Sequence, residues 1–246
     1  MTALHAERGR PLRRRPPRRH SHGPLLTPLL VLAGAALLAF VYVGYVLWPR
    51  WPGPPVGPDA PAIPILIAGV TFNVPPAAIR VAVQRRPGAH ERVDLAFLWP
   101  SLAPPDPSAK PPAPDAKPAP LPTLGRIFLT IAAGGDTLPP ADRVLNIYPR
   151  YVEAESVPGP AGLTVLAFRQ DTPYQGEDLI YDGTAPGFLV RCTRGGAGPT
   201  PGTCLYERRI GAADLVLRFP RDWLADWRTV ADKIDRLIAS LRPVPR

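Results

Sequence analysis

The chain has 246 residues and a formal net charge of +9, and 46% of its residues are hydrophobic. Residues 1–22 contain seven arginines and one glutamate, a net charge of +6, so a net charge of only +3 remains for residues 23–246. A domain with so small a basic excess is a poor match for nucleic acid, whose binding depends largely on phosphate contacts. The length beyond the basic tail is sufficient for one domain with its own hydrophobic core.

An uncharged stretch follows the basic tail at residues 29–48. Twenty residues of α-helix match a hydrocarbon core about 30 Å thick. We therefore expect a basic cytoplasmic tail at residues 1–24 and a single transmembrane helix at residues 25–48. A cleaved secretory signal or a twin-arginine signal is less favoured, because no small-residue cleavage site follows closely and the paired arginines lack the hydrophobic residues expected after them.

Four aromatic residues mark the end of this stretch: Tyr42, Tyr45, Trp48 and Trp51. Amphipathic rings favour the headgroup level of a membrane, and arginine-rich flanks stay on the cytoplasmic side. The sequence therefore predicts a signal-anchor in a bacterial inner membrane, with the amino terminus in the cytoplasm and the rest of the chain in the periplasm. Inner-membrane lipid is the first expected partner.

Two proline-rich stretches interrupt the rest of the chain. Residues 49–62 are predicted to form an extended stalk between the span and an outer domain at residues 63–246. Residues 103–122 combine proline, alanine and charge, and we expect a disordered insertion there. Docking of this insertion to a proline-reading domain is the less favoured interpretation.

Cys192 ends a β-prone run at residues 188–192, and Cys204 begins another at residues 204–210, with a loop of Gly, Pro and Thr between the runs. This pattern predicts a hairpin with a disulfide across its base, which suits an oxidising compartment. A metal or redox site is less favoured, because there is no C-x-x-C motif and no nearby histidine.

The last segment, residues 222–242, has apolar residues three or four positions apart and ends before Pro243. It predicts an amphipathic helix with Asp222 as the N-cap. Further β-prone runs are found at residues 63–74, 93–99, 125–133, 162–170, 178–181 and 214–219. We therefore expect an α+β fold, in which the carboxy-terminal helix packs on an antiparallel sheet of about six to eight strands.

Three blocks of the sequence carry a resemblance to a known family: FNVPPAAIRVAVQRRPGAHERVDLAFLWPSL, RCTRGGAGPTPGTCLYERRI and LVLRFPRDWLADWRTVADKIDRLI. They resemble a family of bacterial single-span, membrane-anchored envelope proteins to which no activity is assigned. The resemblance implies an anchor followed by a cysteine-stapled outer domain. It transfers no functional residues.

Catalytic signatures are weak. Beyond the predicted span, His90 is the one histidine, and no nucleophile elbow, P-loop or dinucleotide motif accompanies it. The sequence suggests no cofactor, metal site or catalytic residue. We therefore expect the outer domain to bind an envelope protein or glycan.

The alternative is a membrane-tethered hydrolase of envelope carbohydrate that uses two carboxylates. Its candidate acids are Glu153, Glu155, Asp171, Glu177, Asp178 and Asp182. A cluster of arginines, Arg80, Arg85 and Arg86 with Arg92 close by, is either solvated or in contact with acidic glycans or lipid headgroups.

Overall fold

The computed structural model describes residues 23–47, 56–57, 59–106, 125–135, 137–183, 187–195 and 202–243. The chain divides into two compact units, Met1–Trp51 and Pro52–Arg246. Most of the predicted stalk, most of the predicted insertion, and the side chains of Trp48 and Trp51 lie outside the described residues.

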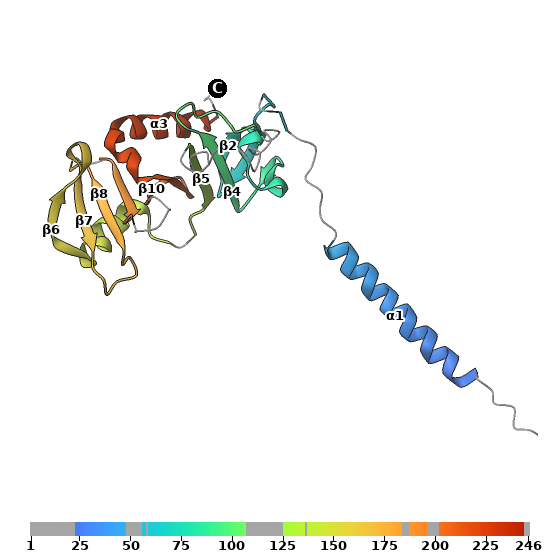
Figure 1. Ribbon diagram of the computed structural model, residues 1–246. Coiled ribbons are helices and arrows are strands. Elements are labelled where there is room, and N and C mark those ends of the chain that lie inside the picture. The colour runs from blue at the N-terminus through green and yellow to red at the C-terminus, as the bar shows by residue number, and fades with distance from the viewer. Residues whose placement is uncertain are drawn as a thin grey trace, which may run out of the picture. The chain divides into compact units, whose positions relative to one another are not determined.

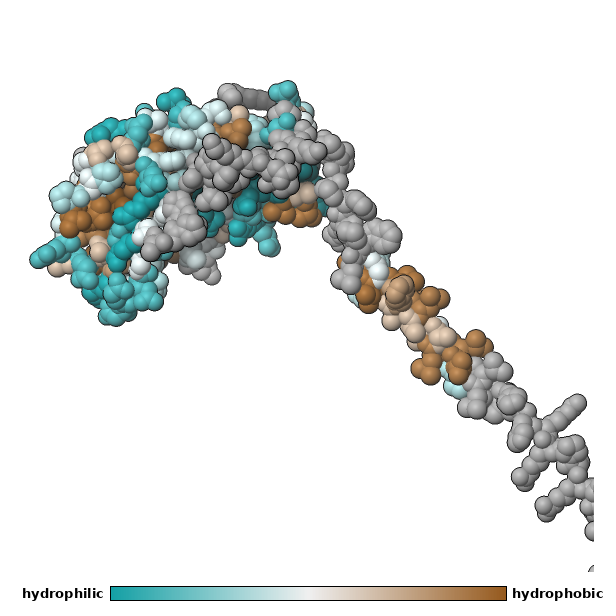
Figure 2. All heavy atoms as spheres, in the orientation of Figure 1, coloured by the Kyte–Doolittle hydropathy of each residue, from teal (hydrophilic) through white to brown (hydrophobic). Residues whose placement is uncertain are grey.

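The first unit contains helix α1, Gly23–Leu47. Its segment Thr27–Val46 is 20 residues long and apolar enough to cross a membrane, a property that a signal sequence near an amino terminus shares. Figure 2 shows mainly hydrophobic side chains on the coloured part of this helix. Tyr42 and Tyr45 are 69% and 80% exposed near its end, so both rings are available to an interface.

The second unit is built on an eight-stranded sheet in which every neighbouring pair is antiparallel. The order is β4-β5-β11-β10-β9-β8-β7-β6. The strands are β4 (Arg92–Leu98), β5 (Arg126–Ala133), β6 (Val152–Pro158), β7 (Thr164–Phe168), β8 (Glu177–Tyr181), β9 (Leu189–Thr193), β10 (Thr203–Ile210) and β11 (Ala213–Pro220). The strand count agrees with the expected sheet.

A smaller sheet has the order β2-β1-β3. Its strands are β1 (Ile63–Ile67), β2 (Val70–Val74) and β3 (Gly88–Ala89), and β1 pairs antiparallel with β2 but parallel with β3. The short helices of the domain are α2 (Pro140–Asn146) and the 3-10 turns η1 (Pro76–Ala78), η2 (Ala82–Gln84), η3 (Tyr148–Arg150), η4 (Pro160–Gly162) and η5 (Arg221–Asp226).

The main core lies between one face of the large sheet, the small sheet and helix α3 (Trp227–Ser240). Figure 1 shows α3 lying along the large sheet. The apolar stripe of the helix is buried as the sequence predicts, with Val230, Ile234 and Leu237 at most 2% exposed. The backbone N–H of Asn73 in β2 donates to the carbonyl of Leu241, which joins the small sheet to the end of this helix. The α+β fold is therefore confirmed.

The predicted start of the carboxy-terminal helix is wrong. The chain enters a 3-10 turn, Arg221–Asp226, directly after β11, and Asp222 lies inside this turn and not at an N-cap. The tighter turn buries Leu224 and stacks Trp223 on Trp99 with ring centroids 4.3 Å apart. The regular α-helix begins only at Trp227.

Candidate functional site

The large sheet is split between its two central strands, β9 and β10. Only two residue pairs join them, Cys204 with Cys192 and Leu205 with Arg191, whereas β10 and β11 are joined by eight. Beyond these pairs, β9 continues along β8 and β10 continues along β11. The two central strands therefore separate on the side away from the cysteines.

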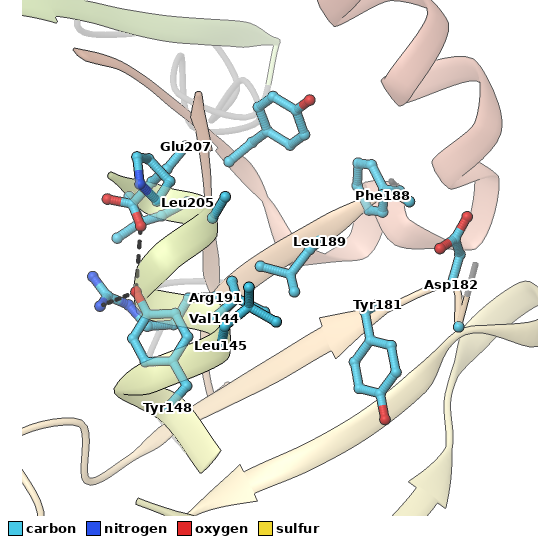
Figure 3. A pocket seen from close by; sticks show the side chains of 15 residues that line it. Val144, Leu145, Tyr148, Tyr181, Asp182, Phe188, Leu189, Arg191, Leu205 and Glu207 are labelled. Atoms are coloured by element: carbon cyan, nitrogen blue, oxygen red, sulfur yellow. Dashed lines mark hydrogen bonds between the residues drawn. The ribbon is translucent and has the colours of Figure 1, made fainter. Parts of the chain in front are cut away.

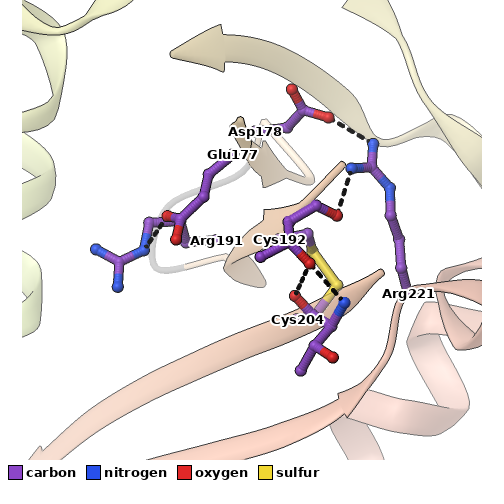
Figure 4. The surroundings of a disulfide bond; sticks show 8 residues. Glu177, Asp178, Arg191, Cys192, Cys204 and Arg221 are labelled. Carbon is purple, nitrogen blue, oxygen red and sulfur yellow. Dashed lines mark hydrogen bonds and ion pairs between the residues drawn. A yellow bond between two sulfur atoms is a disulfide. The ribbon is translucent and has the colours of Figure 1, made fainter. Parts of the chain in front are cut away.

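The disulfide fastens the closed end of this split. Cys192 and Cys204 are bonded, as the sequence predicts, and both side chains are fully buried on the face that packs against α3. The Oγ1 atom of Thr193 accepts a hydrogen bond from the backbone N–H of Thr203 at 2.9 Å, next to the bridge. The junction between the two halves of the sheet is thus held by a covalent bond and very few hydrogen bonds (Figure 4).

A buried carboxylate adds a second fastening beside the disulfide. Asp178 of β8 is 5% exposed and accepts ion pairs from Arg194 at 2.7 Å and from Arg221 at 2.6 Å. Arg221 also donates to the carbonyl of Thr193 at 3.2 Å, which ties the end of β11 to β8 and β9 (Figure 4). A buried charge needs such partners, because burial without them is costly.

A pocket of about 670 Å³ occupies the open end of the split, on the face opposite the disulfide. Helix α2 forms one wall, and β9 and β10 form the floor. Most of the lining is apolar or aromatic: Pro140, Ala141, Val144, Leu145, Tyr148, Tyr181, Phe188, Leu189, Leu205 and Tyr206. Leu145 is 73% exposed, so the pocket has an apolar rim.

Three polar residues cross the pocket in one hydrogen-bonded chain (Figure 3). Arg191 donates to the Tyr148 hydroxyl at 3.4 Å, and this hydroxyl donates to Glu207 at 3.5 Å. Burial, and next the negative charge of Glu207, raise the pKa of Tyr148 above its ordinary value. The phenol therefore stays protonated and can donate to the carboxylate.

The same carboxylate also attaches helix α2 to the sheet. Arg143 donates to Glu207 at 3.1 Å, and none of the seven residues of α2 is fully buried. Arg191 is fixed from its other side by Glu177, with Nε and Oε2 2.7 Å apart. The wall of the pocket is thus a short helix held by one ion pair and by the packing of Val144 against the hydrophobic cluster of Tyr148, Phe168 and Leu179.

The six acids proposed from the sequence do not gather around this pocket. Asp182 is the single member of that set in its lining. Glu153 and Glu155 are exposed on β6, Asp171 forms an exposed pair with Arg169, and Glu177 and Asp178 hold arginines. Glu207, the other acid of the pocket, was not among the candidates.

The histidine and the arginine cluster lie elsewhere, around η2. The His90 ring donates from Nε2 to the carbonyl of Arg86 at 2.8 Å. Among the residues that the structure places, no group of three or more His, Cys, Asp or Glu side chains is arranged to hold a metal ion.

Comparison with known proteins shows the fold. No protein-family profile matches the sequence, and no curated protein matches it. The structure is similar to that of Smlt3025, an immunity protein of the Stenotrophomonas maltophilia type IV secretion system, with 18% identity and a TM-score of 0.51 over 75% of this chain and 94% of that chain. FrpD, an iron-regulated outer membrane lipoprotein of Neisseria meningitidis, gives 9% identity and a TM-score of 0.43 over 76% of this chain and 95% of that chain, too low for any further argument. At such identities the likeness to the immunity protein shows a shared fold alone.

Proposed function

We propose that this chain is a single-pass envelope protein of a bacterial inner membrane, and that its periplasmic domain binds another envelope protein. The helix α1 supports the anchor, and the arginine-rich residues before it support a cytoplasmic amino terminus. The disulfide supports a periplasmic domain, because such bonds persist in oxidising compartments.

The pocket at the split in the sheet carries the proposal that the domain binds a partner. Fold does not specify function, so the site has to. An open pocket of about 670 Å³ with a mainly apolar lining suits large apolar side chains of another protein. The exposed Leu145 extends this apolar surface beyond the pocket, and the chain of Arg191, Tyr148 and Glu207 supplies polar groups that fix orientation.

Paired-carboxylate hydrolysis is less well supported by the same geometry. A general acid and a second carboxylate have to face one scissile bond. In the pocket, the carboxylate of Glu207 is already engaged by Arg143 and Tyr148, and Asp182 is the one candidate acid that lies in the lining. We therefore do not propose a second function.

Site-specific photo-crosslinking in cells tests the proposal. A benzophenone amino acid replaces Leu145 at the rim in the full-length tagged protein, and in a control chain it replaces Val157, which is 56% exposed on the edge strand β6. We expect one protein adduct from position 145 and none of the same mass from position 157. Equal adducts from both positions, or no adduct from position 145, would contradict the assignment to the pocket.

A second comparison locates recognition within the chain. The residues of α1 are exchanged for an unrelated membrane span while the domain is unchanged. Recovery of the same adduct assigns recognition to the domain. Loss of the adduct with the exchanged span assigns recognition to the helix, and an adduct that glycosidases release identifies a glycan partner instead of a protein.

A further inference from the structure

A second surface of the domain combines positive charge with exposed apolar side chains. It comprises residues 80–92, here called the basic loop, which lead through η2 and β3 into β4. Four arginines and one glutamate give this loop a net charge of +3. Val81 and Val83 at its outer turn are 40% and 52% exposed. Neither feature is used by the pocket.

The basic loop is braced from within. Arg85 donates two hydrogen bonds to the carbonyl of Ile79, at 3.1 and 2.9 Å, and Arg86 donates to the carbonyl of Val83 at 3.1 Å. The side-chain oxygen of Gln84 accepts from the backbone N–H of Asp94 at 3.0 Å. These bonds fix the turn in one conformation, so its two valines remain exposed without a flexible loop having to be ordered first.

The arginines frame the two valines. Arg80 precedes them and lies over the ring of Phe128, with the guanidinium carbon 4.8 Å from the ring centroid. Arg86 follows them and is exposed. Arg92 is bound to Asp94 by a bidentate pair, so its charge is largely balanced. A pair of exposed apolar side chains flanked by cations is complementary to a surface with negative headgroups above an apolar interior.

The tether of the domain enters beside this loop. Strand β1 begins at Ile63 and pairs with β3, which is part of the basic loop, through Ile65 with Gly88 and Leu66 with Ala89. Leu66 is itself 40% exposed, and its carbonyl accepts from the N–H of His90 at 2.9 Å. Helix α1 ends at Leu47 and β1 begins at Ile63. Even when fully extended, the connection between these two residues spans at most about 55 Å. The loop is thus within reach of any membrane that α1 crosses.

From this charge complementarity and this short tether, we infer that the basic loop rests on an anionic phospholipid surface. The arginines contact the headgroups, and the valines enter the boundary between headgroups and acyl chains. The loop then sets the orientation of the domain on the membrane, while the pocket stays free for a protein. The inference is independent of what the pocket binds, because it shares no residue with the pocket.

Hydrogen exchange tests this inference on the full-length chain. The protein is reconstituted in nanodiscs of phosphatidylcholine alone and in nanodiscs that also contain phosphatidylglycerol, and exchange of the segment 80–92 is followed by mass spectrometry. We expect this segment to exchange more slowly in the anionic discs than in the neutral discs. High salt should abolish this protection, because it screens exposed charges. Segments of α3 serve as the internal control.

Matched variants separate charge at this site from charge in general. Replacing Arg80→Gln and Arg86→Gln should weaken the contact about fivefold for each arginine. Replacing Arg150→Gln and Arg236→Gln, two exposed arginines outside the loop, removes the same net charge and should leave the protection intact.

Two results would overturn the inference. Equal exchange of the segment in neutral and anionic discs would exclude lipid charge as the cause. If protection of the segment depended on the number of protein chains per disc and not on the lipid composition, the surface would be assigned to contact with a second copy of the protein.

Discussion

Reduction of the disulfide should destabilise the domain and loosen the floor of the pocket. Cys192 and Cys204 are 12 positions apart, and closing a loop of this size stabilises a protein by about 3 kcal/mol in the chain-entropy account. For a protein of this size, that loss corresponds to a fall in Tm of roughly 6 to 12 °C. Because Cys192 and Cys204 are one of only two pairs that join β9 to β10, the effect should concentrate at the split.

The assay is thermal unfolding of the full-length chain in detergent, with and without a phosphine reductant, followed by near-ultraviolet circular dichroism. Reduction keeps both sulfur atoms in the core, so it isolates the bond from the packing. Hydrogen exchange below Tm should accelerate in the peptides that contain Leu189 and Leu205, which line the pocket.

The control is a chain that lacks the disulfide. A chain with Cys192→Ala and Cys204→Ala should show no response to the reductant. A fall in Tm under about 2 °C, or acceleration that is equal in the distant pair β4 and β5, would refute the view that the disulfide holds the split closed.

Three further changes test other parts of the structure. Asp178→Asn should cost about 1–3 kcal/mol in urea unfolding, because it removes a buried charged acceptor from two partly exposed arginines; the exposed Asp171→Asn should stay within about 0.5 kcal/mol. Glu207→Gln should weaken the attachment of α2 by about 1.5 kcal/mol, seen as faster hydrogen exchange in this helix. Burial raises the pKa of Asp94, but its bonds with Arg92 and Thr130 lower the pKa by more, to below its ordinary value. Its stabilising contribution is therefore complete above about pH 4 and is lost as the pH falls through the folded pKa, so wild type and Asp94→Asn should differ at neutral pH and converge in acid.

The sequence predicts the parts of the fold whose side chains alternate between core and solvent. In β4, the inward residues Val93, Leu95 and Phe97 are at most 2% exposed, as their period of two indicates. The stripe of α3 follows the helical period in the same way. These elements are recognisable because their large apolar side chains lie on one face, even though the small Ala96 on the other face of β4 is buried as well.

The edge strand β6 could not be recognised in this way. Its residues Glu153, Ala154, Glu155, Ser156 and Val157 are all exposed, so no alternation marks them as a strand. A shift of register between Val152 and Ser156 interrupts the pairing with β7. Charge, a bulge and the terminal Pro158 are typical of edge strands that resist pairing with other chains, and the same features weaken the β signal.

One feature of the sequence does indicate the pocket. The run Phe188, Leu189, Val190 is apolar without alternation, which indicates a strand covered on both faces. Val190 faces the main core and Leu189 faces the pocket. Pro139 and Pro140 favour the start of a short helix, so the sequence does indicate a helix such as α2. What sequence could not supply is the position of α2 above that second face, because none of its seven residues is fully buried.

The place of the split follows from how β9 and β10 are held on their other sides. Strand β10 is paired with β11 over all eight of its residues, whereas all five residues of β9 are paired with β8. Each strand thus belongs to its own half of the sheet, and a twisted sheet can open where the coupling between halves is weakest. On the core side, Phe188 closes the opening by stacking on Tyr206 and on Trp227 of α3, with ring centroids 5.9 and 5.3 Å apart. The floor of the pocket is therefore formed by both halves of the sheet, whose junction is held by the disulfide, by the ion pairs of Asp178 and by this aromatic stack.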